Sequence, residues 1–369
     1  MTIAVHIAAP VIQNGTSTNF NYKCFTLLAQ SHPKVHFIFI FDQPFPASAI
    51  TEKNITPVLA GPQVKNRMLQ YYFYNFKIPR LLNKYNVDHF VSTEVCSLRT
   101  NVPQLLIIKD LSFLKKNNLL KRADSSYLKR YTKFFVKRSA RIAVLNPTLK
   151  TTLLKTFAVA DDKINIINAA VDTGNSLTYE KTEAIKNNYT EGKEYFLFFS
   201  TPSTVVNTIT MLKAFSIFKK WQRSNMQLLI LFASNEKNTI KDLSSYKYKA
   251  DVKTLNATSL EMSRELIAAA YAAIHLPAVE LTEGEGLNCL ASSIPLITTG
   301  TDFYRNIYHE SALYSQPAEK DIAEKMMLLY KDENTRNELI QKGNAVISAD
   351  SWQNVADSLF HTIQPLTAV

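Results

Sequence analysis

The chain has 369 residues, of which 46% are hydrophobic and 20% are charged, and it carries a formal net charge of +11 at pH 7. This length is sufficient for two domains with separate cores, and the composition is that of an ordinary globular protein. No stretch approaches the roughly 20 consecutive apolar residues of a membrane-spanning helix, and MTIAVHIAAP at the N-terminus lacks the basic region of a signal peptide, so we interpret it as a first strand.

The first half of the chain alternates predicted strands with predicted helices. Short apolar runs predict strands at 2–8, 35–41, 89–93, 103–109 and 141–146. Longer stretches with helical periodicity predict helices at 67–85 and 125–140. Strands that alternate with helices are typical of a parallel sheet covered by helices on both faces.

The second half restarts the same alternation after a polar stretch. Strands are expected at 195–199, 227–232, 251–255, 272–276 and 295–298. Helices are expected at 207–222, 260–270, 286–293, 319–331, 333–345 and 352–363. The predicted fold class is therefore α/β, with two Rossmann-like, doubly wound domains facing a central cleft into which the carboxyl ends of the strands point.

The domain bounds follow from this alternation. We predict an N-terminal domain at 1–170, a connection at 171–193 and a C-terminal domain at 194–350. The last residues, 351–369, are predicted to form a helix that could return to the N-terminal domain.

Three features of the composition bear on function. There are 8 glycines, about a third of the usual share of about 7%, whereas phosphate-binding α/β enzymes usually place several in their loops. Between Lys115 and Lys155, twelve lysines and arginines stand against one acidic residue, an excess equal to the net charge of the whole chain. Three widely spaced cysteines give neither a disulfide framework nor a zinc motif, which indicates a reducing cytoplasm.

Segments along nearly the whole chain resemble GT-B glycosyltransferases of family 4, the glycosyl transferases group 1, of the kind found in Bacteroidetes. The segments that carry the resemblance are SHPKVHFIFIFDQPF (31–45), IPRLLNKYNVDHFVS (78–92), CSLRTNVPQLLIIKDLSFL (96–114), RSARIAVLNPTLK (138–150), DKINIINAAVD (162–172), YFLFFSTPSTVVNTITMLKAFSIFKK (195–220), PLITT (295–299) and ESALYSQPAEKDIAEKMMLLYKDENTRNELIQKG (310–343). The resemblance implies a retaining hexosyltransferase that moves a sugar from a nucleotide-sugar donor to a glycan or lipid-linked acceptor. It also implies that the N-terminal domain serves the acceptor and the C-terminal domain the donor.

The loop STPSTVVN at 200–207 stands where the family holds the donor phosphates. The resemblance implies a glycine and a pair of cations here, but the chain has Ser200, Val205 and Val206. Only Asn207 remains of the family pattern, and it would serve equally well as a helix N-cap, the role that we favour. Two lost charge-assisted hydrogen bonds, at about 1.5–3 kcal/mol each, would lower donor affinity or rate by on the order of 10²–10⁴.

The segment VELTEGEGLNCLASSIP at 279–295 resembles the family's pair of glutamates, of which the first contacts the sugar and the second the ribose. Two registers fit, one with Glu283 and Ala291 at the paired positions and one with Glu280 and Asn288, and both lose the second glutamate. The donor-binding residues that the resemblance implies are Ser200, Val205, Val206, Asn207, Gly284, Gly286, Asn288 and Thr299. The catalytic residues that it implies are Lys109, Glu280 and Glu283.

The same segment is rich in acids, because Glu285 stands where the family has phenylalanine. With Glu280 and Glu283 it would place three carboxylates near an anionic donor. One such repulsion, at about 4 Å and an effective dielectric constant near 20, is about 4 kcal/mol before solvent screening. Three explanations stay open: the donor is not a nucleotide diphosphate, the acids point into solvent, or a divalent metal bridges them at 280–286. We favour a solvated loop, with no cofactor.

Lys109, in KDL at 109–111, stands where the family places a histidine against the donor sugar. Lysine is a point cation, unlike a near-neutral imidazole. It could pair with Asp110 or with the acidic loop, which would be a structural role, or it could supply phosphate-binding charge. The structural role is favoured.

The loop after the first strand is the acceptor-side site that the resemblance implies. PVIQNGTSTNFN at 10–21 keeps a single glycine where the family has a glycine-rich turn. The acceptor-side residues are Gly15, Thr16, Ser17 and Asp110. A plain polar loop that ends in an N-cap is the alternative.

The basic segment FLKKNNLLKRADSSYLKRYTKFFVKRSAR at 113–141 mixes cations with aromatic residues on a predicted amphipathic helix. The resemblance implies docking on the anionic inner face of a membrane, to which each cation near the surface contributes about 1 kcal/mol. The membrane-facing residues are Lys129, Arg130, Lys133, Lys137 and Arg138. A solvated helix is the alternative, and nucleic-acid binding lacks any accompanying motif.

Two classes of function remain. The first is an active glycosyltransferase in the cytoplasm. The second is an inactive GT-B pseudoenzyme that acts as a scaffold or protein partner of an active glycosyltransferase. The simultaneous loss of several donor-side features favours this second class. A third alternative is a sugar-phosphate or polyisoprenyl-phosphate enzyme with another donor geometry. We place the enzyme first, because cations elsewhere in the chain could replace those lost at 200–207.

Overall fold

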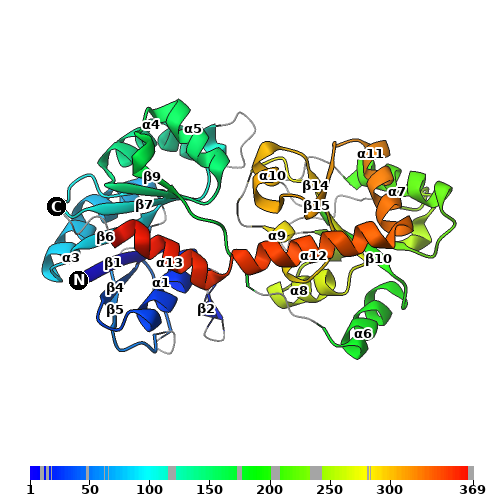
Figure 1. Ribbon diagram of the computed structural model, residues 1–369, viewed down its shortest axis with the longest axis horizontal. Helices are drawn as coiled ribbons and strands as arrows, with labels where there is room; N and C mark the ends of the chain where they lie inside the picture. The colour runs from blue at the N-terminus through cyan, green and yellow to red at the C-terminus, as the bar shows by residue number, and fades with distance from the viewer. Residues whose placement is uncertain are drawn as a thin grey trace. The chain divides into compact units, whose positions relative to one another are not determined.

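The computed structural model describes most of the chain (Figure 1). The described residues are 1–8, 12–13, 16–17, 19–46, 50–61, 63–64, 66–114, 122–172, 177–200, 208–232, 243–280, 282 and 284–364. The chain divides into two compact units. Unit 1 comprises Met1–Ala170 and Ser351–Val369, and unit 2 comprises Val171–Asp350.

Unit 1 contains a seven-stranded parallel sheet in the order β5-β4-β1-β6-β7-β8-β9. The strands are β1 (Thr2–Ile7), β4 (His36–Phe41), β5 (Ile55–Leu59), β6 (His89–Thr93), β7 (Gln104–Ile108), β8 (Arg141–Val144) and β9 (Ile164–Ile166). A two-residue ladder pairs β2 (Ile12–Gln13) with β3 (Thr16–Ser17) in antiparallel fashion. The helices are α1 (Phe20–Ser31), α2 (Arg67–Tyr72), η2 (Phe73–Lys77), α3 (Ile78–Lys84), η3 (Ser112–Leu114), α4 (Arg122–Arg138), α5 (Pro147–Phe157), η4 (Asp161–Lys163) and α13 (Trp352–Ile363).

Alternate residues of the central strands of unit 1 face a core that two helices cover. Phe37, Phe39 and Phe41 of β4 lie in this core together with alternate residues of β1. The last helix of the chain, α13, joins the same core through residues including Leu359, and it lies beside α1 (Figure 1). The C-terminal segment is therefore a structural part of unit 1.

Unit 2 contains a six-stranded parallel sheet in the order β12-β11-β10-β13-β14-β15. The strands are β10 (Tyr195–Ser200), β11 (Gln227–Phe232), β12 (Val252–Asn256), β13 (Ala272–His275), β14 (Leu296–Thr299) and β15 (Ala312–Ser315). The helices are α6 (Tyr179–Thr190), α7 (Thr208–Trp221), η5 (Lys249–Asp251), α8 (Leu260–Ala268), α9 (Glu285–Ala291), α10 (Asp302–Tyr308), α11 (Glu319–Lys331), α12 (Glu333–Ala349). The two parallel α/β sheets confirm the predicted fold class.

Several elements differ from the sequence-based expectation. Of the four edge strands, β12 matches the strand expected at 251–255, whereas β5, β9 and β15 were not predicted. In β5 only Ile55 is buried, and the strand includes Pro57, which edge strands tolerate. The helix predicted at 67–85 contains a π-helical turn, η2, between α2 and α3. The stretch predicted as a connection holds α6, whose start is capped by Thr178. None of the described helices has the length and apolarity needed to cross a bilayer.

We expect Leu359→Ala to lower the free energy of unfolding by about 2–5 kcal/mol, because it leaves a cavity in the core between α13 and the sheet. Leu359 is fully buried, whereas Leu59 on β5 is 55% exposed and provides the matched control. Leu59→Ala is expected to cost less than about 1 kcal/mol. Urea unfolding of both variants measures the difference, and equal effects would contradict the packing of α13 in unit 1.

Candidate functional site

Three neighbouring strands of unit 2 bring polar residues to one edge of its sheet. β13 lies between β10 and β14, and all three run in the same direction. Ser200, His275 and Thr299 end these strands, so they lie at the same edge. The carboxyl edge of a parallel sheet is where α/β proteins bind ligands. This edge is the candidate donor-side site.

Two hydrogen bonds hold the loop that follows β13. The hydroxyl of Thr299 donates to the Pro277 carbonyl over 3.2 Å, and the hydroxyl of Tyr304 on α10 donates to the Val279 carbonyl over 2.8 Å. Glu280 is the next residue and is partly buried. The loop that carries this predicted sugar-contacting carboxylate is thus tied to β14 and α10.

Glu285 opens helix α9, and its carboxyl is not simply solvated. It is partly buried, and its Oε2 accepts a hydrogen bond of 3.3 Å from Nδ2 of Asn288. Burial raises the pKa of the Glu285 carboxyl, while Asn288 and Arg264 lower it to a lesser extent. The favoured expectation of a solvated acidic loop is therefore wrong for Glu285. The Glu285 carboxyl therefore takes up a proton at a higher pH than an ordinary glutamate does.

The two glycines of this segment differ in what surrounds them. A Cβ atom at Gly286 would fall 2.2 Å from the hydroxyl of Tyr308, so this glycine allows α9 to pack on α10. A Cβ atom at Gly284 would meet only an ordinary contact of 3.8 Å with the ring of His275. Packing therefore explains the glycine at 286, and the role of both residues in donor binding stays a prediction.

His275 is a residue of this edge that the sequence analysis did not single out. Burial lowers the pKa of its imidazole to about 4, so the ring is neutral near pH 7. Its ring lies edge-on to that of Phe199, with 5.7 Å between centroids, and its Nδ1 has no hydrogen-bond partner among the described residues. This buried nitrogen is available for a hydrogen bond to a ligand next to Gly284. The signal available in the sequence was a histidine at the end of a buried strand.

Several predicted site residues fall outside the described part of the chain. These are Gly15, Val205, Val206, Asn207 and Glu283, and the side chains of Thr16 and Ser17 are likewise not described. Among the described residues, no group of three histidine, cysteine, aspartate or glutamate side chains could hold a metal ion. Because Glu283 is not described, a metal at 280–286 stays a prediction.

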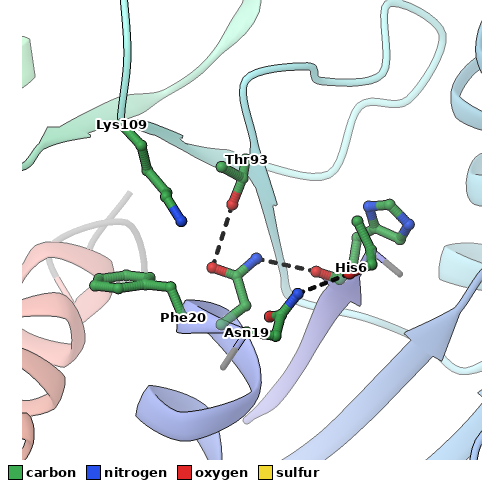
Figure 2. A pocket seen from close by; sticks show the side chains of 7 residues that line it. His6, Asn19, Phe20, Thr93 and Lys109 are labelled. Atoms are coloured by element: carbon green, nitrogen blue, oxygen red, sulfur yellow. Dashed lines mark hydrogen bonds between the residues drawn. The ribbon is translucent and has the colours of Figure 1, made fainter. Parts of the chain in front are cut away.

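Unit 1 contains a pocket of about 280 Å³ at the carboxyl ends of β1 and β6 (Figure 2). Its lining combines one cation with amides, a hydroxyl and an aromatic ring. The residues that line it are His6, Ala8, Asn19, Phe20, Asn21, Thr93 and Lys109. Lys109, a site residue that the resemblance implies in unit 1, therefore lines this pocket.

Hydrogen bonds from α1 build this pocket. The Asn21 amide, which is buried, donates to the His6 carbonyl over 2.9 Å and accepts from the Thr93 hydroxyl over 3.2 Å. Asn19 caps α1 by accepting from the Tyr22 N–H over 3.1 Å and donates to the Ala8 carbonyl over 2.7 Å. These bonds fix the first turn of α1 against the ends of β1 and β6.

Glu94 supports the pocket from the end of β6, and the sequence analysis did not identify it. Its Oε1 accepts hydrogen bonds from the backbone N–H groups of Lys109, over 2.7 Å, and of Asp110, over 3.2 Å. Glu94 also has a φ of +64°, an uncommon backbone conformation for a residue other than glycine. Burial raises the pKa of its carboxyl to about 8, although the two N–H donors oppose this. The available signal was an acid directly after a buried strand.

Asp110 has a structural role in the turn that follows. Its Oδ1 accepts from the N–H of Ser112 over 2.5 Å, and its Oδ2 accepts from the Ser112 hydroxyl over 2.6 Å. These bonds cap η3. Contact of Asp110 with an acceptor stays a prediction.

His6 lies beneath the pocket and is neutral. Its Nδ1 is 2.8 Å from the hydroxyl of Tyr74, and both side chains are buried. Burial lowers the pKa of His6 to about 4, against an opposing influence of Asp42. The imidazole therefore adds no positive charge near pH 7.

Helix α4 exposes the predicted membrane-facing cations. Lys129, Arg130, Lys133 and Lys137 are exposed, and Arg138 is partly buried. Exposed aromatic and apolar residues accompany them on α4 and α2. They are Phe134, which is 44% exposed, and Met68, Tyr71 and Tyr72 at 77%, 40% and 38%. The guanidinium of Arg67 lies 5.7 Å above the ring of Tyr127, which links α2 to α4.

The Glu94 carboxyl should make stability depend on pH. Its pKa is higher in the folded protein, at about 8, than its ordinary value of 4.5, so the folded state binds the proton more tightly. The resulting stability is fully present below pH 4.5, is lost as the pH rises toward 8 and stays lost above it. Each unit of pKa difference corresponds to about 1.4 kcal/mol, an upper limit because the residue is partly exposed.

We therefore expect Glu94→Gln to remove this loss, since glutamine can accept the same two N–H bonds without ionising. Urea unfolding of wild type and variant at about pH 5 and about pH 9 measures it. The variant should gain stability relative to wild type at the higher pH. Glu52→Gln, the same change at a residue bonded to Gln30 and Thr51 on the surface of unit 1, should show no such gain. A parallel response of all three proteins would contradict the assignment.

The comparisons with known proteins agree with this architecture. Residues 180–346 match the family described as Glycosyl transferases group 1. A search of curated proteins found no significant match to the sequence.

Solved structures share the fold over almost the whole chain. A glycosyltransferase from Rickettsia africae is 14% identical, with a TM-score of 0.73 and coverage of 99% of this chain and 98% of that one. Sucrose-phosphate synthase from Thermosynechococcus elongatus is 13% identical, with a TM-score of 0.71 and coverage of 100% and 99%. HepE from Anabaena, in complex with UDP and glucose, is 9% identical, with a TM-score of 0.66 and coverage of 99% of both chains. The match to the glycosyl transferases group 1 family thus covers most of unit 2, and the fold of the whole chain is that of GT-B glycosyltransferase structures.

Proposed function

We propose that this protein transfers a sugar from a nucleotide diphosphate sugar to a glycan or lipid-linked acceptor, with the donor bound at the carboxyl edge of the unit 2 sheet. The observation that carries the proposal is the coincidence of the family match with unit 2, whose sheet edge gathers Ser200, Thr299 and the start of α9. The complexes of Anabaena HepE with UDP and with UDP-glucose support a nucleotide-sugar donor.

The residues of this edge suit different parts of such a donor. Glu280, on the loop anchored through Val279, is proposed to contact the sugar hydroxyls, for which a carboxylate is a good acceptor. Asn288 replaces the carboxylate expected at the ribose, and it can both donate and accept hydrogen bonds. The neutral His275 adds a nitrogen without a described partner at the same edge.

The segment that would face the donor diphosphate, residues 200–207, carries no charged side chain. Leaving-group charge develops during transfer and requires donors or cations aimed at it. The side chains of Val205 and Val206 supply neither a hydrogen-bond donor nor a cation. The inactive scaffold therefore remains the competing function, and nucleotide binding separates the two.

We also propose that α4 and α2 dock on an anionic membrane surface. Exposed cations on α4 provide attraction, and Phe134, Met68 and Tyr72 provide apolar side chains of the kind that enter the interface. Tyr127 and Tyr131 lie between them, with 4.5 Å between ring centroids. A lipid-linked acceptor would be reached at such a surface.

We expect calorimetric titration of the full chain with UDP and UDP-glucose, with and without Mg²⁺, to give saturable binding. Because two charge-assisted bonds are missing, affinity should be about 10²–10⁴ below that of a site with both cations. Val205→Arg with Val206→Lys should restore part of it. Saturable binding by the parent supports transfer, binding by the double variant alone indicates a lapsed site, and binding by neither would refute the donor proposal.

For the membrane proposal, we expect co-sedimentation with vesicles that contain acidic lipids and not with neutral ones. Changing Lys129, Arg130, Lys133 and Lys137 to Ala should remove about 1 kcal/mol of attraction per cation. The matched control removes four exposed lysines of unit 2, at positions 213, 320, 331 and 342. Equal losses in both quadruple variants would show that net charge, and not the α4 surface, drives binding.

A further inference from the structure

The unit 1 pocket has a chemical character that the proposed function leaves unexplained. Among the seven described residues that line it, Lys109 is the only one with a charged side chain near neutral pH, because His6 is buried with a lowered pKa. The lining residues include no carboxylate. A cavity whose one formal charge is a cation favours an anionic ligand.

The position of α1 adds to this polarity. Asn19, Phe20 and Asn21 form the cap and first turn of a 12-residue helix, and all three line the pocket. The first N–H groups of a helix have no partner within it, and the helix dipole makes this end positive. Figure 2 shows the Lys109 side chain extending from its strand toward the same space.

The carboxylates around the pocket are held by other groups. Glu94 accepts the backbone N–H groups of Lys109 and Asp110, and its raised pKa keeps much of it protonated near pH 7. Asp110 is bound twice by Ser112. Asp42 is buried and acts on His6 and Tyr74. Of these three acids, Glu94 is the one whose raised pKa makes it offset the Lys109 charge less than its formal charge suggests.

The rest of the pocket lining combines a hydroxyl with a largely buried aromatic ring. The Phe20 ring is fixed by packing on Trp352, with 5.8 Å between centroids, and the Lys109 ammonium lies 5.6 Å from its centre. Thr93 supplies a hydroxyl whose lone pairs can accept hydrogen bonds. We infer that this pocket binds an oxyanion carried by the acceptor, a phosphate or a carboxylate on a sugar, with Lys109 as its charge partner. The assignment of this oxyanion to the acceptor rests on the proposed function.

The test measures binding to the full chain by calorimetry with three probes: glucose 6-phosphate, glucuronic acid and glucose. We expect at least one anionic probe to bind about 10- to 100-fold more tightly than glucose, as one charge-assisted bond provides. Whichever anionic probe binds more tightly shows whether the pocket prefers a phosphate or a carboxylate. Equal affinity for all three probes would overturn the inference.

Two variants and a control assign the effect to Lys109. Lys109→Gln should reduce the affinity for the anionic probe to that for glucose, and Lys109→Arg should retain most of it. Lys34→Gln removes one exposed cation elsewhere in unit 1 and should leave the affinity unchanged. An unchanged affinity in Lys109→Gln, or an equal loss in Lys34→Gln, would refute the role of Lys109.

Titration of the same samples with UDP separates this inference from the proposed function. Binding of the anionic probe without binding of UDP would leave the pocket standing and count against the transferase. Binding of UDP together with equal affinity for the three probes would support the transferase and overturn the inference about the pocket. If Lys109→Gln loses UDP and the anionic probe alike, Lys109 serves the donor phosphates, and the assignment to the acceptor is wrong.

Discussion

The arrangement of both units depends on one constraint, the burial of parallel strands on both faces. Such strands must be joined by crossovers that return the chain to the opposite edge, so every strand of a sheet ends at the same edge. Partly buried polar residues stand at the carboxyl ends of such strands, as with Thr93 in unit 1 and Thr299 in unit 2. Each candidate site is thus a consequence of how the sheet is built, and its chemistry depends on the side chains at a few strand ends.

Those ends are held by buried hydrogen bonds, which position the candidate residues. Asn21 joins α1 to β1 and β6, and Glu94 holds the backbone of Lys109 and Asp110. In unit 2, Tyr304 holds the loop that leads to Glu280. A buried polar group that loses its partner costs about 1–3 kcal/mol, so each of these contacts resists rearrangement. The supporting residues matter for the geometry as much as those that face the pocket.

The sequence was sufficient for the architecture because the central strands are continuous apolar runs, such as residues 35–41 and 195–199. It was insufficient at the sheet edges, where β5 and β15 are half-exposed and short. Lys109 was identified through the resemblance. Glu94 was not identified. Its raised pKa and its two hydrogen bonds depend on contact with Lys109 and Asp110, which lie 15 and 16 positions further along the chain. Burial of Glu285 likewise depends on packing that no local pattern encodes.

The donor side of unit 2 departs from the family pattern in two changes of charge. The sequence suggests a double loss, with cations missing at 205 and 206 and acids added at 280–285. Burial acts on the second of these changes, because it raises the pKa of the Glu285 carboxyl and makes its ionised form more costly. Removing a repulsion does not supply an attraction, however, and the diphosphate still requires hydrogen-bond donors. The backbone N–H groups near Gly284, together with the Asn288 amide and the His275 imidazole, are neutral groups that could meet part of that need. A site built from neutral donors binds an anion more weakly than one built from cations. For the proposed nucleotide-sugar donor, we therefore expect weak binding at this edge.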